Sequence, residues 1–183
     1  GEYISNETAT QRDHPVEAYN AFLRRLKDGV HSGTARTALD DENSDYYPVT
    51  LERNSLVPGT VYADPYGHTF ILTSLRSQTA RAPGLLLAVD AQPDGTIAIK
   101  RFWKGNFLFN TSGVVGEPGF KAFRPLAFEN GRRRPVANRE LSDASGYKTF
   151  SLMQRNMPAD TFYYRVGRII NPRALDAETA LLD

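Results

Sequence analysis

Three short apolar segments between Leu56 and Asp90 constrain the fold of this chain more than any other feature. They are Thr60 to Ala63, Thr69 to Leu75 and Leu85 to Val89. Pro58-Gly59 precedes the first, and Asp64-Pro65-Tyr66-Gly67 and an Arg/Ala/Pro/Gly loop separate the three. Apolar runs of this length between turn-forming residues are typical of β-strands. The sequence therefore predicts consecutive antiparallel strands here, with His68 at the entrance of the second and Asp90 at the end of the third.

The next segment extends the same pattern. Pro93-Asp94-Gly95 is a strong turn signal, so Leu85–Val89 and Thr96–Trp103 are predicted to form a hairpin. Alternation places Ile97 and Ile99 on one face and Ala98, Lys100 and Phe102 on the other. Further strands are predicted at Tyr147–Gln154 and Thr161–Ile170, and an edge segment containing Pro48 at Tyr46–Arg53.

One helix is predicted near the N-terminus, over Pro15–Asp28. Apolar residues recur at helical spacing through Val16, Tyr19, Phe22 and Leu26, and Asp13 can cap the first turn. A short C-terminal helix is predicted over Arg173–Leu182, opening at Asn171-Pro172. The fold class predicted is α+β: an antiparallel sheet of five to seven strands with the N-terminal helix packed on one face. Residues 1–183 are expected to form a single domain, with residues 1–12 as a flexible arm.

Composition excludes several classes of function. The chain has no cysteine, which removes disulfides, thiolate metal sites and cysteine nucleophiles within these residues and is compatible with an exported, periplasmic protein. The net charge of +1 gives no global field toward nucleic acid, and no apolar run is long enough to span a membrane. Arg132–Arg134 are candidates for binding phosphate or an acidic polymer. Because no aromatic residue interleaves with them, a solvated loop is the favoured prediction.

The central segment resembles a known family. Leu56-Val57-Pro58-Gly59-Thr60-Val61-Tyr62 is similar to the strand opening of bacterial papain-like amidases and peptidases of the NlpC/P60 and CHAP group. Gly67-His68-Thr69-Phe70-Ile71-Leu72 resembles their catalytic-histidine strand, and Ala88-Val89-Asp90-Ala91 the strand that follows it. The resemblance covers about 35 of the 183 residues.

That resemblance implies a papain-like fold and catalytic roles for His68 and Asp90. His68 would activate a cysteine that attacks an amide carbonyl, and Asp90 would fix the tautomer of the imidazole. The substrate implied is a peptide or a peptidoglycan-like molecule. The missing cysteine leaves three explanations open: a mutated nucleophile, a non-catalytic relative, or an accidental likeness. If the likeness holds, the N-terminus of the Pro15–Asp28 helix should face the free nitrogen of His68.

Two other functions remain open. Tyr62, Tyr66, Trp103 and Asn106 are candidates for lining a groove, so a non-catalytic glycan- or peptide-binding module is one alternative. The other is a cysteine-independent hydrolase or lyase using His68, with a metal held by His68, Asp64 and Asp90. No cofactor is predicted. Asp64 competes with Asp90 as the partner of His68, although capping the Asp64–Gly67 turn is the role favoured for it.

Overall fold

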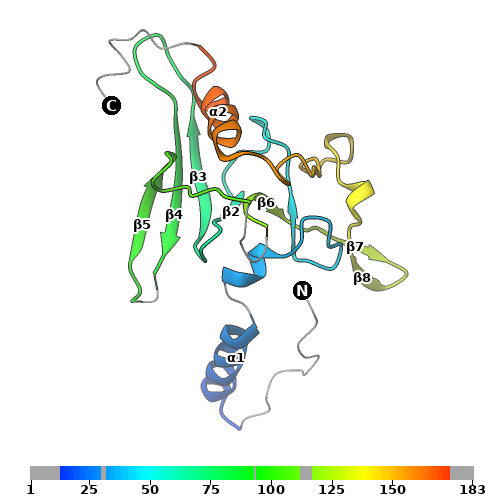
Figure 1. Ribbon diagram of the computed structural model, residues 1–183. Coiled ribbons are helices and arrows are strands. Elements are labelled where there is room, and N and C mark those ends of the chain that lie inside the picture. The colour runs from blue at the N-terminus through cyan, green and yellow to red at the C-terminus, as the bar shows by residue number, and fades with distance from the viewer. Residues whose placement is uncertain (1–12, 30–31, 93, 112–116, 174–183) are drawn as a thin grey trace.

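The computed structural model describes residues 13–29, 32–92, 94–111 and 117–173, and its α+β class agrees with the sequence prediction (Figure 1). Its main element is a six-stranded sheet in the order β1-β6-β2-β3-β4-β5, and all five neighbouring pairs are antiparallel. The strands are β1 (Tyr46–Pro48), β2 (Val61–Ala63), β3 (Thr69–Arg76), β4 (Leu85–Ala91), β5 (Ile97–Arg101) and β6 (Gly119–Phe123). The predicted edge strand containing Pro48 is β1, which pairs only with β6 in this sheet.

Local turn chemistry sets the connections between the central strands. The predicted β4–β5 hairpin is present: Gly95 donates its amide to the Gln92 carbonyl, and Gln92 donates to the Thr96 carbonyl. Gly95 has φ +87°, a backbone conformation that glycine adopts without a side-chain penalty. A bulge between Leu72 and Ser74 interrupts the β3–β4 ladder. Such a bulge bends and twists the pair of strands that carries His68 and Asp90.

The core lies on one face of the sheet, called here the inner face. Tyr62, Phe70 and Phe120 from three adjacent strands are almost fully buried there. The helix α2 (Ala159–Ile170) packs on this face through Phe162, Val166 and Ile170, and the rings of Phe109 and Phe162 stack with centroids 3.9 Å apart.

The segment Thr161–Ile170 was predicted as a strand, and that prediction is wrong. Phe162, Val166 and Ile170 recur every four residues, which places them on one side of a helix. The β-branched and aromatic residues of the segment pointed toward a strand, but burial of this helical stripe decides its structure. Asn171, predicted to open a helix, is instead the residue at which α2 ends, where its amide donates to the Gly167 carbonyl. The helix predicted over Arg173–Leu182 falls almost wholly outside the described residues, as does the arm at 1–12.

The N-terminal helix α1 (Pro15–Gly29) exists, but it does not pack on the sheet as predicted. Val16, Tyr19, Phe22 and Leu26, the residues of its apolar stripe, keep between 44% and 60% of their surface exposed. Figure 1 shows α1 projecting away from the sheet, with its C-terminal end toward the short 3₁₀ helix η1 (Ser32–Arg36). The helix that covers the sheet is α2, because its stripe contacts the aromatic core and that of α1 does not.

Two other predictions also need correction. The basic residues 132–134 do not form a loop: they belong to β8 (Arg132–Pro135), which pairs with β7 (Leu126–Glu129) in a separate hairpin. The segment Tyr147–Gln154 was predicted as a strand, but it is irregular and joins the sheet region through a single bridge between Val49 and Phe150. Two further 3₁₀ turns, η2 (Asn138–Glu140) and η3 (Asp143–Ser145), precede it.

Candidate functional site

The turn before β3 holds His68 at the entrance of that strand. One oxygen of Asp64, Oδ1, accepts hydrogen bonds from the amides of Tyr66, Gly67 and His68 at 2.7, 2.7 and 2.9 Å. Asp64 is buried, and its own amide donates to the His68 carbonyl at 2.9 Å. The prediction that Asp64 caps this turn is therefore confirmed. Its carboxylate fixes the backbone of His68 and does not act as the partner of the imidazole.

The structure brings His68, the residue just before β3, next to Asp90 on the adjacent antiparallel strand β4. Phe70 lies opposite Asp90 in the β3–β4 register, and His68 precedes Phe70 by two residues, so all three share the inner face. His68 Nδ1 lies 3.5 Å from Asp90 Oδ2. The His68 side chain is 52% exposed, whereas that of Asp90 is 3% exposed. The predicted proximity of the two residues is confirmed: a buried carboxylate faces one ring nitrogen of a half-exposed imidazole.

Asp90 has two further partners that sequence reasoning missed. Gln92 donates its Nε2–H to Asp90 Oδ2 at 2.5 Å, and Lys100 Nζ lies 3.9 Å from the same oxygen. A buried carboxylate is stable as an anion only when such donors and cations compensate its lost hydration. The sequence contained part of the information needed to predict these partners. Gln92 follows Asp90 by two residues, and the register of the β4–β5 hairpin places Lys100 on the same face as Asp90. Asp90 is therefore contacted by Gln92 from the turn after β4, Lys100 from β5 and His68 from the turn before β3.

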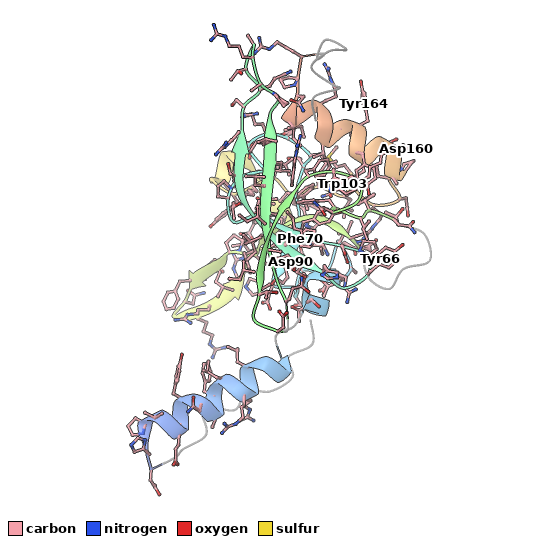
Figure 2. The ribbon with its side chains drawn as sticks, turned by 90° about the vertical axis from the view of Figure 1, so that its left-hand side faces the viewer. Tyr66, Phe70, Asp90, Trp103, Asp160 and Tyr164 are labelled. Atoms are coloured by element: carbon pink, nitrogen blue, oxygen red, sulfur yellow. The ribbon has the colours of Figure 1, made fainter. Side chains whose placement is uncertain are left out.

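The four aromatic and amide candidates for a binding groove separate into two classes. Tyr62 is fully buried, and its hydroxyl donates to the Leu108 carbonyl at 2.6 Å, so it packs in the core and does not line a groove. Asn106 Nδ2 donates to the Arg101 carbonyl, which makes it a loop-stabilising residue. Tyr66 and Trp103 are both largely exposed. Figure 2 labels both, together with the neighbouring pair Phe70 and Asp90.

The predicted position of α1 opposite His68 is wrong. Figures 1 and 2 both show that the N-terminal end of α1 is the end farthest from the sheet. The amides of its first turn therefore do not face the imidazole, and the first of them to be satisfied, that of Val16, donates to His14 Nδ1. The site therefore pairs the imidazole of His68 with the carboxylate of Asp90, and the N-terminus of α1 is not part of it (Figures 1 and 2).

Arg134 in the β7–β8 hairpin is compensated by neighbouring carboxylates. Arg134 bonds the carboxylates of Glu129 and Glu140, and the hydrogen bonds from Arg134 lower the pKa of Glu140 to about 2. Arg134 is therefore engaged in structural ion pairs within its own hairpin region. In the described ranges, no group of three or more His, Asp or Glu side chains is placed to hold a metal ion. The hypothesis of a metal bound by His68, Asp64 and Asp90 loses Asp64, because that carboxylate binds the amides of its own turn.

No described helix is long and apolar enough to cross a bilayer. No family model matches the sequence, and no curated protein or solved structure shows significant similarity to it.

Proposed function

We propose that this chain contributes the histidine–carboxylate pair of an amidase or peptidase site that acts on peptide substrates of the bacterial cell-wall type; the helix N-terminus that the papain-like resemblance placed beside the imidazole is not part of the proposal (Figure 1). The observation that carries the proposal is the contact between His68 Nδ1 and Asp90 Oδ2 across β3 and β4. A carboxylate at this nitrogen favours the tautomer with its proton on Nδ1 and leaves Nε2 free as a base. The His68 side chain is half exposed, and in this proposal Nε2 is the ring nitrogen that meets the substrate.

The proposed chemistry assigns one role to each residue. Nε2 of His68 takes the proton from a thiol, and the thiolate attacks the amide carbonyl carbon. The imidazolium then returns that proton to the leaving amine, while Asp90 stabilises the charged ring. Because the chain contains no cysteine, the attacking thiolate in this proposal belongs to a residue that is not among these 183.

The competence of His68 can be tested without that thiolate, using p-nitrophenyl acetate. Nε2 attacks the acyl carbon, p-nitrophenolate leaves, and water hydrolyses the acyl-imidazole. The rate of p-nitrophenolate release above that of the buffer alone measures this reaction and is called the fast component. His68→Ala should remove the fast component, and Asp90→Asn should slow it about tenfold or more, as expected for loss of an oriented base.

His14→Ala is the matched control for these variants. His14 is also exposed, but its Nδ1 accepts a hydrogen bond from the Val16 amide, and among the described residues it takes part in no ion pair with a carboxylate. Its removal should leave the fast component intact. Equal rates for the wild-type chain, His68→Ala and Asp90→Asn would contradict the proposal. A second readout, the imidazole ¹⁵N shifts, should show the Nδ1–H tautomer of His68 in the wild type and its loss in Asp90→Asn.

A non-catalytic peptide- or glycan-binding module is the second candidate, favoured by the exposure of Tyr66 and Trp103. Exposed aromatic side chains of this kind contribute large contact areas to ligand binding. Trp103 is the single tryptophan of the chain, so its fluorescence reports on ligand contact directly. Saturable quenching by a soluble cell-wall peptide or oligosaccharide, weakened by Tyr66→Ala and unaffected by His68→Ala, would support this function over the catalytic one.

A further inference from the structure

The face of the sheet opposite the core carries an uncovered apolar surface. Ile71, Val89 and Ile99 lie side by side across β3, β4 and β5 in the ladder, and Ile97 and Leu87 extend the surface along the strands. Ile97 and Ile99 are 72% and 76% exposed. This set of five residues is called the outer patch. Apolar side chains gathered in one area in this way indicate an interaction surface more than singly scattered ones do.

The same outer face is covered next to the patch. Ala35 of η1 packs against Val61 and Ala63 of β2, and Val61 lies directly opposite Ile71 in the ladder. The cover provided by η1 therefore ends where the outer patch begins. The start of η1 also contacts the sheet beside the outer patch. There Thr69 Oγ1, at the start of β3, donates a hydrogen bond to the carbonyl of Ser32, the first residue of η1.

A second uncovered apolar surface, that of α1, precedes η1 by only two residues of sequence. Its stripe consists of Val16, Tyr19, Phe22 and Leu26, all of them exposed. A 15-residue helix is marginally stable in water without tertiary contacts, so this amphipathic face needs a partner surface. Among the described residues, both apolar surfaces are therefore left exposed in a single chain.

The dimensions of the two surfaces match. Fifteen residues of helix extend about 22 Å with a diameter of about 10 Å including side chains. Three neighbouring strands span about 10 Å, and the eight residues of β3 extend about 26 Å. One helix therefore covers the outer patch along its length and across its width.

We propose that the outer patch binds the α1 helix of a second copy of this chain, so that two copies exchange their N-terminal helices. Each chain carries both the donor and the acceptor surface, so a two-fold axis closes the assembly with two identical contacts. The structure favours exchange over docking within one chain, because α1 points away from its own sheet (Figure 1). This proposal is independent of the catalytic role of His68, which lies on the inner face.

The first test is the solution mass of the full chain. Sedimentation equilibrium should give twice the 20.4 kDa of one chain. Ile99→Lys and Phe22→Glu should each convert the dimer to a monomer. Phe128→Lys is the matched control, because Phe128 is an equally exposed strand residue on the β7–β8 hairpin, outside the outer patch. A monomeric wild-type chain, or a dimer unaffected by both substitutions, would overturn the proposal.

The second test uses the absence of cysteine, which makes introduced thiols unique. Phe22→Cys and Ile99→Cys chains, mixed and treated with a short bis-maleimide, should give a cross-linked heterodimer. Neither singly substituted chain should give the same product alone. A double variant that cross-links only within one chain would show that α1 covers its own sheet and would overturn the exchange.

Discussion

Replacing Lys121 with methionine should stabilise the fold at neutral pH. Lys121 lies on β6, beside Val61 on the outer face, and it is 1% exposed. Its Nζ donates to the Thr37 carbonyl just after η1 at 3.2 Å. Burial lowers the pKa of Lys121 from 10.5 to about 8, because the charged form loses its hydration.

The size of the effect follows from that shift. A change of one pKa unit corresponds to 1.36 kcal/mol, so keeping this ammonium charged in the fold costs about 3 kcal/mol below pH 8. Methionine removes this cost but leaves the Thr37 carbonyl without its donor, and that loss destabilises the fold by about 1 kcal/mol. The expected net gain in the free energy of unfolding at pH 7 is therefore about 2 kcal/mol.

The pH dependence distinguishes this explanation from a simple packing gain. Between pH 8 and 10.5 the unfolded state binds more protons at this lysine than the folded state, so wild-type stability rises with pH in that window. The advantage of Lys121→Met should then be about 2 kcal/mol smaller at pH 9.5 than at pH 7. Urea unfolding of both proteins at the two pH values measures this difference in the free energy of unfolding. An advantage that does not change with pH would refute the assignment of the cost to a buried charge.

Three further substitutions test the packing and turns that position the site. Gly95→Val should cost about 1 kcal/mol or more, because the φ of +87° strains a β-branched residue; unchanged thermal stability would argue against the turn. Phe162→Ala should cost about 3–5 kcal/mol by leaving a cavity between α2 and the sheet, whereas the exposed Tyr164→Ala on the same helix should change the unfolding midpoint little. Gln154→Ala should cost about 1–3 kcal/mol in urea unfolding, because its side-chain amide satisfies the backbone of Phe120 and Val49 inside the protein. A loss no larger than that of an exposed residue would contradict this last role.

The sequence predicted best what short-range chemistry decides. The turn at Asp64 and the hairpin at Gly95 follow from residues that favour one local conformation, and both are present. The adjacency of His68 and Asp90 followed from them, since two antiparallel strands joined by a short connection leave few possible registers.

The errors concern long-range packing. Both helices have an apolar stripe, but only the stripe of α2 meets the aromatic core; nothing in the residues of α1 alone shows whether the sheet or another surface covers them. The segment Thr161–Ile170 was assigned from its strand-favouring residue types, although its four-residue spacing matches the helix. Residue type was given more weight than periodicity there, and periodicity proved the better guide.

The two aspartates near His68 show why proximity in sequence is a poor guide to the partner of an imidazole. Asp64 is four residues away, but three backbone amides converge on one of its oxygens, and its side chain is committed to the turn. Asp90 is 22 residues away, yet alternation along β3 and the β3–β4 register place it on the face of His68. The turn aspartate fixes where the histidine backbone lies, and the strand aspartate lies 3.5 Å from one nitrogen of its ring. The proposed function needs an oriented base and therefore both aspartates, which is why that proposal rests on the His68–Asp90 contact and not on either residue alone.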